Sequence, residues 1–188
     1  MLSAKFGHVL DTPLGPIAKR IPINPNILTV VGFLITLIAA LVIPKNLRLG
    51  GILILIGGVF DILDGVVARA GGKTTKFGAF LDSVLDRYSD AFLFLSLSWF
   101  FIERGNSTGV FLSLGTLVGA FLISYTKARA EGLGKSCNTG IMERPERLIL
   151  LIFATITGWL MPVLWIMIIL THFTVIQRVY HVWSGMKR

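Results

Sequence analysis

The chain has few of the residues that build redox or thiolate metal sites. Cys137 is the only cysteine among 188 residues, so no internal disulfide or thiolate cluster can form. The three histidines, His8, His172 and His181, lack metal-ligand spacing, and we expect them to lie at the membrane interface or between helices. Charged residues are also scarce, at 15% against 54% hydrophobic residues. This balance excludes a soluble domain of this size, and the length excludes two membrane domains.

Apolar stretches of helical length run through most of the chain. Each approaches the roughly 20 residues needed to cross the core of a bilayer, and the fifth is short. The six stretches are residues 27–43, 49–69, 77–102, 109–130, 147–160 and 162–182. We therefore predict an all-α integral membrane protein with six transmembrane helices and an N-terminal interfacial segment.

The first residues differ from the spans that follow. Residues 1–22 mix apolar residues with three prolines, and we expect them to lie in the membrane interface. Because they contain no long apolar run typical of a cleavable signal, we expect them to stay attached to the transmembrane domain, residues 23–188. Pro25 and Asn26, followed by Thr29, mark the start of the first span, where an asparagine can cap the free amides.

Basic residues are divided unevenly between the two ends of the predicted helices. The net charge is +8, and only Lys45, Arg48 and Arg104 lie in the odd-numbered turns. By the positive-inside rule, both termini and the even-numbered turns face the cytoplasm of a multi-pass cell-membrane protein. This basic face could bind anionic lipid headgroups or phosphates. Nucleic acid is a poor partner, since no basic soluble domain and no alternation of aromatic and basic residues is present.

Four carboxylates lie inside the second and third predicted spans, where an uncompensated charge costs several kcal/mol. Asp61 and Asp64 are three residues apart, and Asp82 and Asp86 are four apart, so each pair projects from one side of its helix. The polar turn at 70–76 contains glycine and lets the two helices fold back on each other. At about 1.5 Å per residue, both pairs reach a similar depth near the cytoplasmic side. We predict that the four carboxylates face one another.

Such a group of carboxylates is suited to hard divalent cations, which take oxygen ligands and share them with substrate phosphates. Two divalent ions would neutralise four ionised carboxylates, so a dinuclear centre is electrostatically reasonable. It could clamp a pyrophosphate, while a carboxylate left partly free could act as a base.

Intramembrane acids also occur in cation transporters, which are the alternative from another class. A transporter would more often carry them near the middle of the membrane, on broken helices within inverted repeats. Here the acids adjoin a cytoplasmic turn and no repeat is visible, so the sequence favours an enzyme.

The aspartates belong to a longer pattern, Asp61-x2-Asp64-Gly65-x2-Ala68-Arg69-x8-Gly78-x3-Asp82-x3-Asp86. It resembles the signature of the CDP-alcohol phosphotransferases at every fixed position. The resemblance implies that Asp61, Asp64 and Asp82 are metal ligands, and that Asp86 is both a ligand and the general base. It also implies two Mg²⁺ or Mn²⁺ ions and a homodimer. The CDP-lipid site implied by the resemblance contains Asn26, Thr29, Asp61, Asp64, Gly65, Ala68, Arg69, Thr75 and Gly78.

The reaction implied by the resemblance is attack of an alcohol oxygen on the β-phosphorus of a CDP-alcohol. It forms a phosphodiester and releases CMP. Membrane members of the family use CDP-diacylglycerol or, in archaea, CDP-archaeol. Positioning and metal electrostatics would supply most of the rate.

Polar and basic residues near the last three spans bear on the identity of the acceptor. They could converge on a phosphate dianion, although ordinary anchoring on the positive side is the alternative for each one. These residues are Ser124, Lys127, Arg144, Arg147 and Arg178. The segments that carry them are similar to phosphatidylinositol-phosphate synthases and their archaeal counterparts, which use L-myo-inositol 1-phosphate. Glycerol 3-phosphate, giving phosphatidylglycerol phosphate, is the alternative acceptor.

Other residues in the spans have a structural interpretation. Asp90 continues the face of Asp86 by one turn, and Arg87 adjoins it; we expect both to form hydrogen bonds or ion pairs between helices. Gly115 and Gly119 have the spacing of a close helix–helix contact within a membrane.

Overall fold

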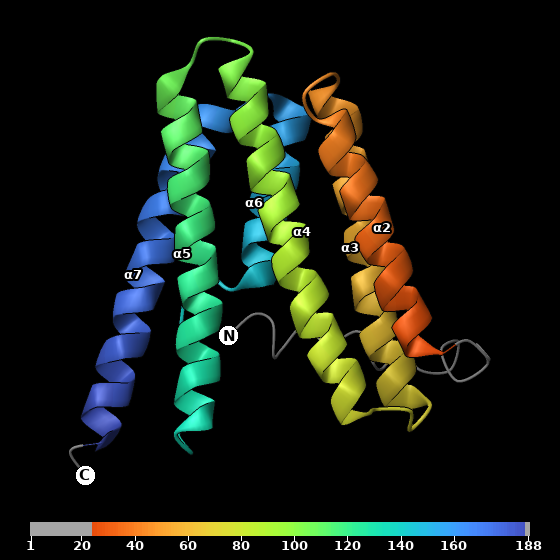
Figure 1. Ribbon diagram of the computed structural model, residues 1–188, viewed down its shortest axis with the longest axis vertical. Coiled ribbons are helices and arrows are strands. Elements are labelled where there is room, and N and C mark those ends of the chain that lie inside the picture. Colours follow the sequence, from red (N-terminus) through yellow and green to blue (C-terminus); the bar gives the residue numbers. More distant parts are fainter. Residues whose placement is uncertain (1–23, 187–188) are drawn as a thin grey trace.

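A computed structural model describes residues 24–186, and within that range it contains six α-helices and no strand (Figure 1). The helices are α2 (Pro25–Val42), α3 (Leu47–Ala70), α4 (Lys76–Ile102), α5 (Ser107–Gly132), α6 (Arg144–Thr157) and α7 (Leu160–Met186). Each overlaps one of the predicted spans, so the all-α prediction is confirmed. The interfacial segment predicted for residues 1–22 lies outside the described residues.

The helices have the lengths and surfaces of membrane spans. Four of them, α2, α3, α5 and α7, are long and apolar enough to cross a membrane. Their outward side chains are large and exposed, with Leu41 at 69%, Phe111 at 67% and Ile176 at 63% of their full accessibility. In a soluble protein such a surface would aggregate, whereas in a bilayer it faces lipid. The chain is therefore a multi-pass membrane protein.

Polar side chains fix where the helices begin. Thr75 accepts a hydrogen bond from the amide of Gly78 at 2.9 Å and so caps α4. At α2 the cap is Asn24, which accepts from the amide of Asn26 at 3.0 Å. The sequence indicated Asn26, two residues later, as the cap, but Pro25 has no amide hydrogen and occupies the first helical position. The side chain of Asn26 is therefore available to the site described below.

Small residues bring α2 and α3 close together just above the aspartates of α3. A Cβ atom on Gly57 would lie 2.6 Å from the Thr36 hydroxyl and 3.2 Å from the carbonyl oxygen of Gly32. No side chain larger than hydrogen fits there without moving one helix. The same principle applies between α5 and α7, where Gly119 faces Thr171 and Gly115 faces Ile168. The predicted packing role of the glycine pair on α5 is confirmed.

Helix α6 is short and reaches only part of the way through the molecule. Its 14 residues extend about 21 Å, less than the roughly 30 Å of a bilayer core. In Figure 1 it fills the upper half of the bundle and begins at mid-height, between α4 and α7, while α4 and α5 continue below it. Pro145 lies in its first turn and Gly158 ends it with φ +82°. The span thus begins and ends three residues earlier than predicted, with Arg144 inside the bundle.

Candidate metal centre and flanking pockets

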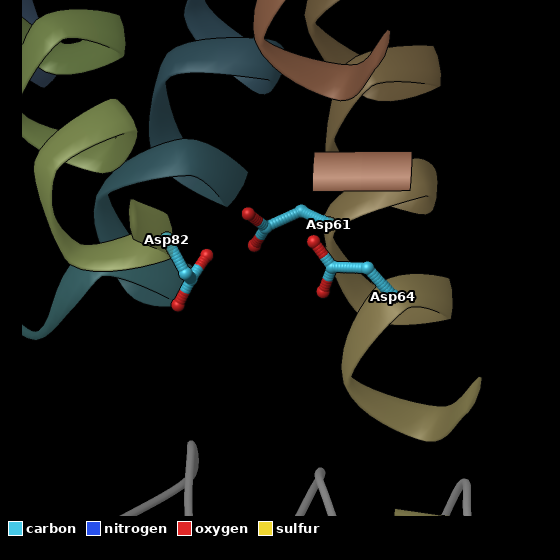
Figure 2. A group of neighbouring side chains, drawn as sticks. All are labelled: Asp61, Asp64 and Asp82. Carbon is cyan, nitrogen blue, oxygen red and sulfur yellow. The ribbon is translucent and has the colours of Figure 1, made fainter. Parts of the chain in front are cut away.

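Three carboxylates converge between α3 and α4. Figure 2 shows Asp61 and Asp64 projecting from α3 toward Asp82 on α4. One oxygen from each side chain lies within 4.8 Å of the others. The spacing of three residues places both α3 carboxylates on one face, and the short turn 71–75 returns α4 beside it. These three side chains are called the acid cluster below.

A divalent cation fits the acid cluster. Asp64 is only 7% exposed, and its Oδ2 atom has no hydrogen-bond partner among residues 24–186. A buried carboxylate oxygen without a partner is strongly unfavourable, and such atoms in native proteins often mark an ion or water. Carboxylate oxygens are also the preferred ligands of Mg²⁺ and similar hard cations. Asp61, Asp64 and Asp82 therefore offer suitable ligand atoms for a metal ion, and a bound ion would provide the missing partner of the Asp64 oxygen.

Asp86, the fourth predicted ligand, is joined to the acid cluster through an arginine. Nη1 of Arg144 lies 2.7 Å from Oδ2 of Asp61 and 2.8 Å from Oδ1 of Asp86. The Nε atom of Arg144 is buried and has no hydrogen-bond partner in the described part of the chain. Sequence reasoning placed Arg144 with the acceptor and missed its contact with the acids. Nothing local indicates it, because 83 residues separate Arg144 from Asp61.

A pocket lies on one side of the acid cluster, between the start of α2, the end of α3 and the turn before α4; we call it the loop pocket. Every residue predicted for the CDP-lipid lines this pocket except Asp61, which projects toward Asp82 within the acid cluster (Figure 2). Sequence reasoning missed Pro25, Lys73, Thr74 and Ala79, which also line it together with Asp82. The polar turn that carries Lys73 and Thr74 was a signal for them, because it adjoins the aspartates in sequence.

Two glycines keep the loop pocket open. A Cβ atom on Gly78 would lie 2.8 Å from Oδ1 of Asn26 and 3.0 Å from the hydroxyl of Thr75. A Cβ atom on Gly65 would lie 3.0 Å from Nη1 of Arg69. A larger residue at either glycine of the sequence pattern would therefore displace a polar side chain of the pocket, Arg69 or Asn26, from its position.

A second pocket, called the basic pocket here, lies on the other side of the acid cluster, below the start of α6. All five residues predicted for the acceptor phosphate line it, and Asp86 forms its boundary with the acid cluster. The predicted members are Ser124, Lys127, Arg144, Arg147 and Arg178. They come from α5, α6 and α7 and meet because α6 begins at mid-height.

Two of these arginines are already bound by protein groups. Nη2 of Arg147 lies 2.6 Å from Oδ2 of Asp90. Arg178 donates to the carbonyl oxygens of Thr139 at 2.8 Å and Ile123 at 2.5 Å, and to Glu143 at 3.0 Å. Both arginines line the pocket and add positive charge. The Nε atoms of Arg144 and Arg147 have no hydrogen-bond partner among the described residues. The interhelical ion pair expected of Asp90 is thus present.

Arg87, expected to join two helices, instead donates to an oxygen of its own helix. Its Nη1 atom lies 2.6 Å from the carbonyl oxygen of Ser83, one turn earlier on α4. The same atom lies 3.7 Å from Asp86. An arginine four residues after a carbonyl can reach back along its helix, and the sequence alone did not distinguish this from an interhelical contact.

The family model of the CDP-alcohol phosphatidyltransferases matches residues 22–178. The chain belongs to this family. An archaetidylinositol phosphate synthase of Methanothermobacter thermautotrophicus is 36% identical over 190 residues, covering 97% of this chain and 95% of the relative. A family enzyme with two pockets around an acid cluster does not fit the alternative of a cation transporter.

Solved structures of a family member share the fold. The crystal structure of Mycobacterium tuberculosis phosphatidylinositol phosphate synthase with CDP-DAG bound gives a TM-score of 0.82 at 32% identity, over 93% of this chain and 94% of that one. A second structure of the same enzyme, in complex with manganese and citrate, gives 0.77 at 31% identity, over 93% and 89%.

Proposed function

We propose that the protein transfers a phosphatidyl-type group from a CDP-lipid, CDP-diacylglycerol or CDP-archaeol, to L-myo-inositol 1-phosphate and releases CMP. One observation carries the proposal: the acid cluster lies between the loop pocket, lined by the family pattern, and a basic pocket suited to a phosphate. A phosphate-transfer centre needs this order of donor, metal and acceptor. The relatives named for inositol phosphate lipids support the same acceptor.

The residues that would hold the metal are Asp61, Asp64, Asp82 and Asp86, and we propose two Mg²⁺ or Mn²⁺ ions. Bound there, such ions supply electrostatic stabilisation to a pyrophosphate and to the departing phosphate. Manganese in the relative's structure and the unpartnered oxygen of Asp64 support this assignment.

The CDP-lipid would bind in the loop pocket. Asn26, Thr29 and Thr75 offer polar groups there, and Arg69 and Lys73 offer positive charge for the diphosphate. Gly65, Ala68 and Gly78 leave room for the nucleotide to approach the helix backbone. This arrangement would present the β-phosphorus to the side of the acid cluster that faces the basic pocket.

Asp86 would act as the general base. It lines the basic pocket and also adjoins the acid cluster through Arg144, so an acceptor hydroxyl beside it would face the donor. The hydroxyl proton would pass to the Asp86 carboxylate as the oxygen bonds to the β-phosphorus. The bond from that phosphorus to the bridging oxygen breaks, and CMP leaves.

The acceptor phosphate would bind among Ser124, Lys127 and Arg144, within the positive field of Arg147 and Arg178. Arg144 offers its buried Nε donor, and Lys127 offers an ammonium group. A neutral polyol would leave these cations without a counter-charge, so the pocket favours a phosphorylated acceptor over free inositol or serine.

We also propose that the site opens to the cytoplasm, that both termini lie there in the cell membrane, and that the protein is a homodimer. The uneven distribution of basic residues supports the orientation, because the turn before α4 and the end of α5 lie at one end of the bundle (Figure 1). The dimer rests on the resemblance to the family.

An acceptor panel tests the proposed function. Purified protein in detergent is supplied with CDP-diacylglycerol and Mg²⁺, and CMP release is measured with inositol 1-phosphate, glycerol 3-phosphate, inositol or serine. We expect release with inositol 1-phosphate and little with the two neutral acceptors. A preference for glycerol 3-phosphate would change the acceptor, and release without regard to the acceptor's phosphate would contradict the assignment of the basic pocket.

A further inference from the structure

An ion pair with no direct part in the proposed bond-making step lies in the wall of the basic pocket, one helical turn along α4 from Asp86. Arg147 and Asp90 have side-chain exposures of 3% and 5%, and their charged atoms are 2.6 Å apart. A second nitrogen of Arg147 donates to the carbonyl oxygen of Met142 at 3.3 Å. One guanidinium thus joins α4 to the chain segment just before α6, away from solvent.

This pair is in register with the contact made by Arg144. Asp86 and Asp90 lie four residues apart on α4, while Arg144 and Arg147 lie three apart at the start of α6. These spacings place each pair of residues on one helix face. The result is two parallel ion pairs between α4 and α6: Asp86–Arg144 beside the acid cluster, and Asp90–Arg147 one turn further along α4.

The second pair restrains the first. Arg144 is the first residue of α6 and has a long side chain, so its position depends on where the helix begins and how it is rotated. The contacts of Arg147 restrain both the start and the rotation of α6. Arg147 lies in the first turn of this helix and is bound to Asp90 on α4 and to the carbonyl oxygen of Met142 just before α6. A shift of about 1 Å in a substrate-positioning group can reduce a rate by roughly 100-fold.

We infer that Asp90 and Arg147 form a positioning pair that holds Arg144 where it binds the acceptor phosphate. Arg147 acts through Arg144, because both of its terminal nitrogens are bound, one by Asp90 and the other by the carbonyl oxygen of Met142. The inference rests on the proposed function, since it concerns the acceptor of that reaction. It assigns a role to Asp90, whose carboxylate is bound by Arg147.

Asp90→Asn separates this role from direct binding of phosphate by Arg147. We expect Asp90→Asn and Arg147→Gln each to raise the KM for inositol 1-phosphate by roughly 10- to 100-fold and to leave the KM for CDP-diacylglycerol within about twofold. The double variant should be no worse than either single variant, because the two residues act as one unit. Glu103→Gln, which disrupts an exposed contact with Arg104 at the far end of α4, is the control and should change neither KM.

Several results would overturn the inference. If Asp90→Asn leaves the acceptor KM unchanged or lowers it while Arg147→Gln raises it, Arg147 binds the phosphate directly. If the variants lose thermal stability and keep both KM values, the pair is merely structural.

Should the single variants fail to fold, Asp90→Leu with Arg147→Met removes both charges and favours folding. A normal acceptor KM in that double variant would also refute the inference. Absence of acceptor-dependent CMP release from the wild-type protein would instead refute the proposed function, and the inference with it.

Discussion

At the scale of the residue, the account depends on polar atoms that the protein leaves unsatisfied. The buried oxygen of Asp64 lies inside the acid cluster, and the buried Nε of Arg144 lies beside the basic pocket. One needs a cation and the other needs an acceptor of hydrogen bonds. Their positions on either side of Asp61 and Asp86 explain how a metal and an anionic substrate can be held within one small volume.

Removing the Asp64 carboxylate should greatly weaken metal binding. Asn is nearly the same size but neutral, so Asp64→Asn should weaken Mn²⁺ binding by more than about 100-fold and reduce CMP release at least as much. Titration calorimetry or Mn²⁺ spin resonance on the detergent-purified protein measures the affinity directly. The exposed Glu131→Gln is the matched control. Unchanged Mn²⁺ affinity in Asp64→Asn would show that the metal lies elsewhere.

Truncating Arg144 should affect the two substrates differently. Arg144→Ala removes charge-assisted hydrogen bonds worth about 1.5–3 kcal/mol, so the KM for the phosphorylated acceptor should rise roughly 10- to 100-fold. The KM for the CDP-lipid should change much less, because the loop pocket lies on the other side of the acid cluster. Arg144→Lys keeps the charge and should recover part of the loss. Equal increases in both KM values would count against the basic pocket as the acceptor site.

At the scale of the element, close packing of helices sets the depth and direction of the site. Gly57 lets α3 approach α2, and this contact places Asn26 and Thr29 opposite Asp64 in the loop pocket. The short α6 has a different effect: because it begins at mid-height (Figure 1), Arg144 and Arg147 in its first turn lie in the wall of the basic pocket. The helices therefore shape both substrate pockets as well as crossing the membrane.

Adjacent glycines on α3 provide a test of this packing. Gly57→Ala places a methyl group 2.6 Å from the Thr36 hydroxyl, whereas Gly58→Ala meets no atom within 4 Å. We expect Gly57→Ala to lower the thermal midpoint by several degrees and raise the CDP-lipid KM, since overpacking costs about 1–3 kcal/mol. Gly58→Ala should be neutral or slightly stabilising. Equal midpoints for the two variants would mean that the α2–α3 contact is looser than described.

The sequence predicted those parts of the molecule that depend on local spacing. Asp61, Asp64 and Asp82 meet as expected, because helix periodicity and one short turn determine their directions. The contact of Arg144 with Asp61 could not be predicted, since it depends on where α6 begins in three dimensions. The cap of α2 was predicted at Asn26 and lies at Asn24 for a local reason. Pro25 has no amide hydrogen, so it occupies the first helical position and the cap is the residue before it.

At the scale of the whole molecule, a membrane enzyme must bring a lipid and a water-soluble anion to the same place. The apolar outer surface keeps the bundle in the bilayer, and the acid cluster lies between the loop pocket and the basic pocket near one end of it. A lipid donor can reach this depth from the membrane, and a soluble acceptor can reach it from the basic face. The proposed reaction uses both routes at once.

The most direct test of the account is transfer of label between its two proposed substrates. Purified protein is given CDP-diacylglycerol and inositol 1-phosphate labelled in the ring, first with EDTA and then with excess Mn²⁺, and the lipid fraction is counted. We predict that labelled lipid and an equal amount of CMP form only after Mn²⁺ is added, and that Asp64→Asn forms neither. Labelled lipid in the presence of EDTA, or CMP release with no label in the lipid, would contradict a metal-dependent transfer at the acid cluster.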